Sequence, residues 1–292
     1  MNKSFTLIEI LVVIVIIGII SAFIIVSMAG VSSKANIAKS QAFANSLRNS
    51  LLLNLVSEWK LNGDVADAWG INSGVWHGSG GGEYTAASWR TGSECVSGGC
   101  LAFDGTDDDI STGYSGLASV QGTVEFWVKF TEDKGQGLFH FFESGLPTSD
   151  YIRSYISPGR SIDLLIEDGN VSMLNVSYVF NHGNQWNHIV WLQDGQSVKL
   201  YVNGQIRTLG GTNNGSWWSG HLTLGYACFG NAWGYLHGFM DDIRVYNQAL
   251  PTSAIQEEYY SGLMALFKNN GIALSEFNQR VAELKYTLTN NE

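Results

Sequence analysis

The chain has 292 residues, of which 45% are hydrophobic and only 14% are charged, and its formal net charge is −10. This composition excludes a disordered protein, a collagen and a coiled coil, because each of those classes needs a different balance of apolar, charged and glycine residues. The acidic balance also disfavours a basic nucleic-acid surface, so no nucleic-acid partner is expected.

A single long apolar run occupies the start of the chain, from Phe5 to Ala29. About 20 apolar residues span the hydrocarbon core of a bilayer as a helix, so this run predicts one membrane-crossing helix. Its only charged residue is Glu9. Apolar residues then recur every three or four positions up to Leu55. This spacing predicts one continuous helix over residues 5–57.

The residues around Glu9 carry a short motif, in which a polar leader from Met1 to Ser4 is followed by Phe-Thr-Leu-Ile-Glu. The motif resembles the class III signal of type IV prepilins and pseudopilins. The resemblance implies that a prepilin peptidase cuts between Ser4 and Phe5, and that the new N-terminus is methylated. Glu9 is then an assembly residue, because its carboxylate can pair with the α-amine of Phe5 in a neighbouring subunit inside an apolar filament core. The resemblance further implies insertion in the cytoplasmic membrane, followed by display on the cell surface or in an extracellular filament.

The composition changes near Glu58, where glycine and tryptophan become frequent and the helical pattern stops. Short alternating runs such as Val124 to Phe130 and Val198 to Val202 predict β-strands, and Asn203-Gly204 predicts a hairpin turn. Roughly ten short strands in about 200 residues favour a single β-sandwich over residues 58–260.

Several ordered segments support this interpretation: Leu101–Asp108, Gly122–Lys129, Gln185–Val190 with Leu200–Gln205, Leu222–Gly225, and Leu236–Leu250. Together they resemble a laminin-G-like jelly roll of the concanavalin A-like lectin/glucanase superfamily. The resemblance implies a mainly β fold, an antiparallel jelly-roll β-sandwich, carried here on the long N-terminal helix. It also implies one structural calcium ion, which family members often hold with the loop after the first strand and a late Asp. In this chain the corresponding residues are Asp67, Asn72, Asp241 and Asp242.

The sequence contains no Glu-x-Asp-x-x-Glu run, the pattern with which retaining glucanases of the superfamily place two catalytic carboxylates on one strand. The protein is therefore not expected to be an enzyme. Two polar loops rich in aromatic residues favour a sugar-binding surface instead, since sugars stack on exposed rings. The predicted ligand-binding residues are Trp217, Trp218, Trp233 and Tyr235. The alternative is that one Trp of the first pair fills the end of the sandwich.

The chain has three cysteines. Cys95 and Cys100 flank Val-Ser-Gly-Gly, a hairpin-like tip that allows a disulfide between them. This pairing indicates an oxidising, extracytoplasmic compartment. Cys228 is left over and is expected to be a buried free thiol.

The residues after the predicted sandwich have helical patterns. Residues 261–292 contain two short amphipathic patterns separated at Gly271, which predict a C-terminal helical hairpin attached to the sandwich. Pro251 is expected to begin a separate short helix, with Ser253 and Gln256 as its capping box.

The whole chain is thus predicted to be a type IV pilin-like surface filament subunit that displays a laminin-G/lectin-like domain for adhesion or for carbohydrate or protein binding. Its expected partners are other pilin subunits, the prepilin peptidase, the membrane and surface glycans. Two alternatives stay open: a minor pseudopilin of a secretion or uptake machine, and a single-span membrane-anchored surface protein that does not polymerise. The predicted organisation is a leader over residues 1–4, a helix over 5–57, the sandwich over 58–260 and the helical hairpin over 261–292.

Overall fold

The computed structural model describes residues 52–78, 88–119, 121–142, 151–157, 159, 161–168, 171–179, 183–195, 197–212, 217–227 and 234–290. The predicted leader and the predicted N-terminal helix up to residue 51 lie outside these residues, and so do the processing and assembly residues Ser4, Phe5 and Glu9. Within the described part of the chain, no helix is both long enough and apolar enough to cross a membrane.

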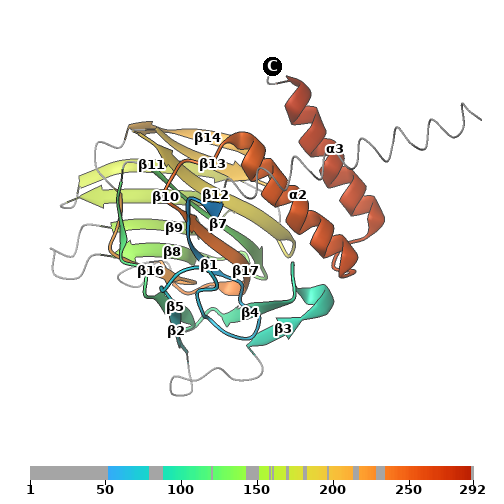
Figure 1. Ribbon diagram of the computed structural model, residues 1–292, viewed down its shortest axis with the longest axis horizontal. Coiled ribbons are helices and arrows are strands. Elements are labelled where there is room, and N and C mark those ends of the chain that lie inside the picture. The colour runs from blue at the N-terminus through green and yellow to red at the C-terminus, as the bar shows by residue number, and fades with distance from the viewer. Residues whose placement is uncertain are drawn as a thin grey trace, which may run out of the picture. The chain divides into compact units, whose positions relative to one another are not determined.

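Two antiparallel sheets pack face to face and form a β-sandwich (Figure 1). The larger sheet has eight strands. In spatial order they are β14 (Gln205–Thr212), β13 (Ser197–Val202), β12 (Trp186–Asp194), β7 (Gln121–Phe130), β17 (His237–Tyr246), β4 (Gly99–Asp104) and β3 (Trp89–Thr91), with β1 (Leu55–Trp59) also paired to β17.

The second sheet has seven strands. In spatial order they are β11 (Val171–Val179), β10 (Ser161–Asp168), β9 (Tyr151–Ser157), β8 (Gln136–Phe142), β16 (His221–Leu224), β5 (Asp109–Thr112) and β2 (Gly74–His77). A two-stranded sheet pairs β15 (Trp217–Ser219) with β6 (Gly116–Ser119). The predicted fold class, a mainly β antiparallel sandwich followed by two C-terminal helices, is confirmed.

The hydrophobic core lies between the two large sheets. On β7 the buried Phe126 and Val128 belong to this core, whereas Glu125 and Trp127 point to the opposite side, because successive side chains of a strand alternate. Phe126 packs edge-on against Phe139 of β8, with the ring centroids 6.0 Å apart. Each sheet therefore has one face in the core and one outer face.

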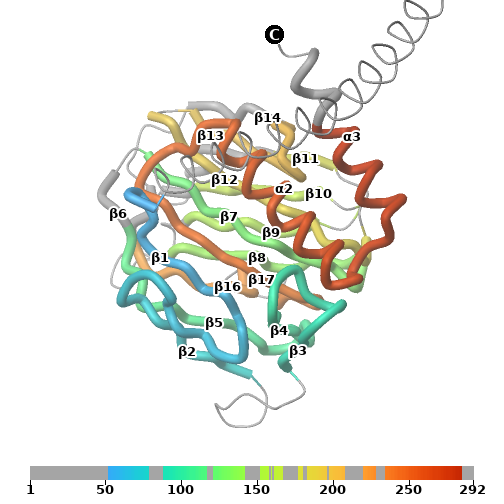
Figure 2. The backbone as a smooth tube through the Cα atoms, turned by 45° about the vertical axis from the view of Figure 1, so that its right-hand side comes forward, coloured from blue at the N-terminus to red at the C-terminus, as the bar shows by residue number. Residues whose placement is uncertain are grey.

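Two helices, α2 (Thr252–Lys268) and α3 (Leu274–Asn290), cover the outer face of the larger sheet (Figures 1 and 2). The guanidinium of Arg280 on α3 donates a 2.8 Å hydrogen bond to the backbone carbonyl of Trp186 at the start of β12. Leu263 and Leu266 of α2 are fully buried in a cluster with Trp127 of β7 and Trp186 of β12. The helical hairpin therefore packs against the sandwich as part of one hydrophobic unit.

Helix α2 is longer than either of the two helices that the sequence predicts in this region. One helix runs through Thr252–Lys268, where two shorter ones were expected. Ala254, Ile255 and Tyr259 are buried on the same helix as Leu263. Their burial stabilises the helical conformation between the two expected helices. The N-cap of this helix is Pro251, which makes no side-chain capping hydrogen bond. Ser253 lies inside the helix and not at its N-cap, so the expected capping box does not form.

The N-terminal helix ends earlier than the sequence predicts, because strand β1 begins at Leu55. The helix was expected to reach Ser57, but Leu55–Trp59 is a strand paired antiparallel with β17, and Trp59 lies opposite Ile243. The three-to-four-residue spacing of the leucines favours a helix locally. Pairing with β17 buries Leu55 and Trp59, and this long-range gain outweighs the local preference.

The predicted disulfide between Cys95 and Cys100 is present, with the two Cα atoms 5.3 Å apart. Asp241 of β17 holds the loop that this disulfide closes. Its Oδ2 accepts the backbone N–H groups of Val96 and Ser97 at 2.9 and 3.1 Å. Cys228 lies outside the described residues.

Candidate functional site

The outer face of the seven-stranded sheet carries a row of polar side chains. Arg153 of β9 is the register partner of His140 of β8. On the other side of His140 lies Thr223 of β16, and Ser111 of β5 follows Thr223. Phe139, the neighbour of His140 along β8, points into the core, so strand alternation directs this row away from the core. Four adjacent strands thus align polar groups on one face.

Three tyrosines extend this row. Tyr226 meets His140 edge-on, with ring centroids 6.1 Å apart and the ring planes at 84°. Tyr235 lies against Tyr226, with ring centroids 4.8 Å apart. The guanidinium carbon of Arg153 lies 5.7 Å from the ring centroid of Tyr155. We call the continuous set Tyr235, Tyr226, His140, Arg153 and Tyr155 the tyrosine strip.

Local structure fixes the two ends of the strip. Tyr226 follows β16 and Tyr235 precedes β17, and the two residues form a β-bridge with each other. Tyr155 lies on β9 between Ser154 and Ile156, two buried residues that face the core side. The strip is therefore built on strands and on a bridge between strand ends, which gives its side chains a rigid support.

Burial controls the charge of the strip. His140 is 4% exposed, and this burial, together with the positive charge of Arg153, lowers the pKa of its imidazole to about 4. At neutral pH the imidazole is therefore uncharged. Tyr226, Tyr235 and Arg153 are half-buried. Half-exposed rings beside hydroxyl and guanidinium donors have the chemistry that binds sugars, which stack on rings and exchange hydrogen bonds at their hydroxyls.

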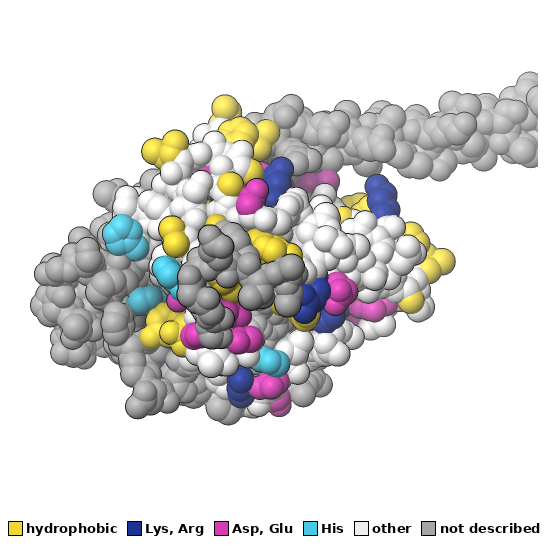
Figure 3. Space-filling view, turned by 90° about the horizontal axis from the view of Figure 1, so that it is seen from below, with side chains coloured by type: hydrophobic (Ala, Val, Ile, Leu, Met, Phe, Trp, Pro, Cys, Tyr) yellow, Lys and Arg dark blue, Asp and Glu magenta, His cyan; other side chains and the backbone are white. Residues whose placement is uncertain are grey.

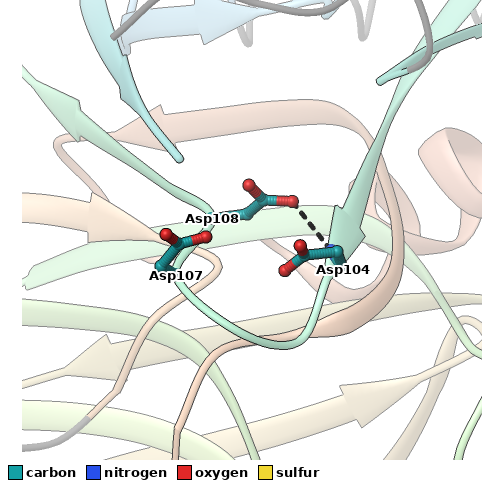
Figure 4. A group of neighbouring side chains, drawn as sticks. All are labelled: Asp104, Asp107 and Asp108. Atoms are coloured by element: carbon teal, nitrogen blue, oxygen red, sulfur yellow. Dashed lines mark hydrogen bonds between the residues drawn. The ribbon is translucent and has the colours of Figure 1, made fainter. Parts of the chain in front are cut away.

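The end of β4 and the turn that leads to β5 carry three carboxylates, Asp104, Asp107 and Asp108, which we call the acidic cluster (Figure 4). One oxygen of each lies within 4.8 Å of the others. Asp108 Oδ2 accepts the backbone N–H of Asp104 at 2.8 Å. Burial and the neighbouring carboxylates raise the pKa of Asp108 to about 6. Hard cations such as calcium bind carboxylate oxygens, so the chemistry of this cluster fits a calcium ion.

The acidic cluster adjoins the tyrosine strip. Burial raises the pKa of Tyr235, and the negative charges of Asp109 and Asp107 raise it further. Asp109 Oδ1 lies 2.9 Å from Nδ1 of His77 on the edge strand β2. Figure 3 shows acidic side chains beside histidine and hydrophobic side chains on the lower face of the molecule. The strip thus carries a positive charge at Arg153, beside its Tyr155 end, and lies near negative charges at its Tyr235 end.

Of the four residues predicted to bind a ligand, Tyr235 is a member of the strip. Trp217 and Trp218 lie on β15, whose partner is β6. Trp233 lies outside the described residues. The role of the three tryptophans in ligand binding stays a prediction.

The other members of the strip were missed by the sequence analysis. Tyr155, Arg153 and His140 lie on two neighbouring strands, and Tyr226 lies some 70 to 90 positions further along the chain. Their spacing matches no local motif. Alternation within β9 could have placed Arg153 and Tyr155 on one face, but only the register shows that this face meets His140.

Asp67, one of the predicted calcium ligands, organises the turn that follows β1. Its Oδ1 accepts the backbone N–H groups of Glu58, Trp69 and Gly70 at 2.8 to 3.0 Å. Its Oδ2 accepts the N–H of Asn72 at 3.0 Å. Burial acts to raise the pKa of Asp67, but these four hydrogen bonds outweigh it and leave the pKa lowered. The carboxylate is thus ionised and surrounded by backbone donors.

Asp241 and Asp242, two further predicted calcium ligands, lie on β17 where its pairing with β7 shifts register. Burial and the adjacent carboxylate of Asp242 raise the pKa of Asp241 well above its ordinary value. Asp241 Oδ1 is buried and accepts no hydrogen bond from the described residues. The calcium set Asp67, Asn72, Asp241 and Asp242 stays a prediction, and the acidic cluster is a second group with suitable chemistry.

Two protein families match parts of the chain. Residues 104–256 match the family described as Laminin_G_3, concanavalin A-like lectin/glucanases superfamily. Residues 1–25 match the prokaryotic N-terminal methylation motif. Both resemblances inferred from the sequence are therefore confirmed. Comparison with curated protein sequences finds no match.

Several solved structures share the fold. Domain 4 of AbnA, a GH43 extracellular arabinanase from Geobacillus stearothermophilus in complex with arabinotriose, aligns with a TM-score of 0.55 and 20% identity, over 70% of this chain and 97% of that domain. A structure of botulinum neurotoxin type C, whose cell entry is described as dependent on two ganglioside molecules, aligns with a TM-score of 0.56 and 10% identity, over 74% of this chain and 53% of that one.

The binding domain of botulinum neurotoxin DC in complex with SialylT aligns with a TM-score of 0.52 and 10% identity, over 73% of this chain and 52% of that one. The present chain therefore aligns with only about half the length of the neurotoxin chains. At these identities the similarity shows a shared fold.

Proposed function

The chain belongs to the concanavalin A-like lectin/glucanases superfamily, and from this fold and the tyrosine strip we propose that it is a carbohydrate-binding protein of the prokaryotic cell surface. The observation that carries the proposal is the strip itself, which joins three tyrosines, an uncharged histidine and an arginine on one face of a sheet. The arabinanase domain and the neurotoxin are described with arabinotriose and with gangliosides, and this supports a saccharide as the ligand class.

Each part of the strip has a role in this proposal. The rings of Tyr226 and Tyr235 stack against the apolar C–H face of a sugar ring. The guanidinium of Arg153 and the hydroxyls of Thr223 and Ser111 exchange hydrogen bonds with sugar hydroxyls along the same row. Because the strip crosses several strands, it suits a chain of sugars better than a single ring.

We place the function in binding and not in hydrolysis. A retaining glycosidase needs two carboxylates about 5–5.5 Å apart that flank the scissile bond. The tyrosine strip consists of Tyr, His and Arg residues, so its members offer no pair of carboxylates. The carboxylates of the acidic cluster lie beyond its Tyr235 end. A polysaccharide turnover assay tests this point, since release of reducing ends by the purified protein would contradict it.

A calcium ion is the cofactor that we assign to the acidic cluster. Asp104, Asp107 and Asp108 would supply three of the six to eight oxygen ligands that calcium takes. When bound, the ion would neutralise the charge of Asp107, one of the two carboxylates that raise the pKa of Tyr235. The residues of the cluster would thereby order the anionic end of the tyrosine strip.

The N-terminal methylation motif supports display on a filament. In this proposal the peptidase cuts between Ser4 and Phe5, and Glu9 pairs with the amine of Phe5 in the next subunit. Mass spectrometry of the native N-terminus tests the processing, because a mature chain is expected to begin at methylated Phe5. A chain that keeps Met1 would support the anchored, non-polymerising alternative. The abundance of this protein in sheared filaments distinguishes the two assembled roles, because a major subunit is abundant there and a minor pseudopilin is scarce.

The experiment that tests binding is a glycan array probed with the detergent-solubilised full chain. We expect retention on neutral oligosaccharides of several residues and weaker retention on the matching monosaccharides, because the strip extends over several strands. An array on which no glycan retains the protein, with or without calcium, would contradict the proposal.

A further inference from the structure

Three large apolar side chains stand out from the surface close to the start of β1. Ile71 is 96% exposed, Leu53 is 83% exposed and Trp69 is 48% exposed. Residues of these types are usually buried, and a group of them on a surface marks an interaction site. We call Leu53, Trp69 and Ile71 the apolar collar.

The turn that carries Trp69 and Ile71 is held firmly. On one side, the carboxylate of Asp67 accepts the backbone N–H of Trp69 at 3.0 Å. On the other side, the amide Nδ2 of Asn72 donates to Ser57 Oγ at 2.7 Å. The two apolar side chains are therefore presented outward by a turn that hydrogen bonds fix from within.

The turn also returns toward the beginning of the domain. The backbone N–H of Ala68 donates to the carbonyl of Glu58 at 2.7 Å, and Asp67 forms an antiparallel bridge with Trp59. The chain after β1 thus turns back alongside that strand before it enters β2 (Figure 2). Leu53 lies two positions before β1, so the collar flanks the place where the preceding residues join the domain.

Charge indicates what covers the collar. Residues 31–50 carry Lys34, Lys39 and Arg48 and no acidic residue, together with apolar side chains such as Ile37 and Phe43. Residues 51–292 carry the remaining 16 − 4 = 12 basic and 26 − 1 = 25 acidic residues, a net charge of −13. Two such domains repel each other, whereas the basic segment of one copy is attracted to the domain of another.

We propose that the apolar collar is the surface on which residues 31–50 of a second copy of this chain dock. The proposal rests on the subunit assembly proposed above. An anionic lipid surface is a poorer occupant, because it attracts basic segments and repels an acidic domain. Three side chains bury too little area for a stable dimer on their own. The contact therefore acts within an array, where the apolar N-terminal segments supply the main association and the collar fixes register.

The test places a photo-crosslinking residue at Ile71 of the full chain in cells that assemble the protein. The expected product has twice the subunit mass, and its crosslinked peptide maps to residues 31–50 of the other copy. The matched control is the same residue at Val179, which is 69% exposed on β11, the opposite edge of the seven-stranded sheet. No crosslink to residues 31–50 is expected there.

A double variant, Trp69→Ser with Ile71→Ser, is expected to lower the amount of sheared filament by roughly an order of magnitude, because avidity in an array multiplies each weak contact. Val179→Ser is expected to leave it unchanged. In a sample whose N-terminus is methylated Phe5, crosslinks from position 71 to lipid, polysaccharide or another protein, or no crosslink, would overturn the inference. An unprocessed N-terminus would overturn the proposed assembly itself.

Discussion

Tyr259 of helix α2 lies stacked over Trp127 of strand β7, with ring centroids 5.8 Å apart and ring planes at 20°. Both rings belong to a buried cluster that also contains Cys95 and Cys100. The C-terminal helices, which the sequence presents as an addition to the sandwich, thus cover one outer face of it. The tyrosine strip lies on the outer face of the other sheet.

Replacing Tyr259 with Ala is expected to lower the free energy of unfolding by about 3–5 kcal/mol, the usual cost of removing a buried aromatic side chain. Urea unfolding followed by circular dichroism at pH 7 measures this. The control Ser261→Ala changes an exposed position of the same helix and is expected to shift stability by less than about 0.5 kcal/mol. Equal stability of the two variants would show that α2 is only loosely attached.

Arg244 of β17 pairs with three acidic side chains, one each from β1, β7 and α2. Its Nε lies 2.8 Å from Glu58, and its Nη1 lies 3.2 Å from Glu125 and 3.0 Å from Glu258. Arg244→Met leaves the fully buried Glu125 without its guanidinium partner. We expect a loss of about 3–5 kcal/mol in the free energy of unfolding. Lys134→Met, which removes an exposed ion pair, is expected to lower the free energy of unfolding by at most about 1 kcal/mol. A similar loss in Arg244→Met and Lys134→Met would show that Glu125 does not need the guanidinium of Arg244.

His140 is expected to make the protein less stable in acid. Its folded pKa is about 4, against about 6.5 in the unfolded chain. Below pH 6.5 the unfolded chain therefore takes up a proton that the folded protein does not, and the free energy of unfolding falls as the pH drops toward 4. At pH 4.5 the loss is roughly 2–3 kcal/mol.

The variant His140→Leu isolates this effect, because all other titrating groups are shared. We expect the stability of the wild type relative to the variant to be greater at pH 7 than at pH 4.5 by roughly 2–3 kcal/mol. Urea unfolding at both pH values measures it. A pH-independent difference would show that His140 titrates normally.

Calcium is expected to raise the melting temperature of the full chain, since an ion that binds only the folded state stabilises it. Asp107→Asn is expected to abolish this shift if the acidic cluster holds the ion. Asp241→Asn tests the ligand set predicted from the sequence. Loss of the shift in Asp241→Asn, with the shift retained in Asp107→Asn, would assign the ion to that set.

Much of the fold could be predicted because its signals are local. The Asn203-Gly204 turn joins β13 to β14, and both residues have positive φ, 54° and 74°, as the dipeptide indicates. Cys95 and Cys100 pair across a short loop. In contrast, β1 forms through pairing with a strand that lies nearly 190 positions away. Such non-local pairing leaves no local signal, so local spacing indicated a helix.

The candidate site could be predicted only at one end. Tyr235 belongs to an aromatic loop that is visible in the sequence. Its partners His140 and Tyr155 lie on strands whose relative register depends on the whole sheet. A shift of one residue would turn either side chain into the core, so the strip could not be identified before the pairing was known.

Sugar binding by the tyrosine strip is measured by the affinity for the oligosaccharide that retains the protein best on the array. Isothermal titration calorimetry compares the full chain with the double variant Tyr226→Ala, Tyr235→Ala and with Tyr260→Ala, which removes an exposed tyrosine on α2. We expect the double variant to lose at least about tenfold in affinity, or about 1.4 kcal/mol, and Tyr260→Ala to bind as the wild type does. Unchanged binding by the double variant would contradict it.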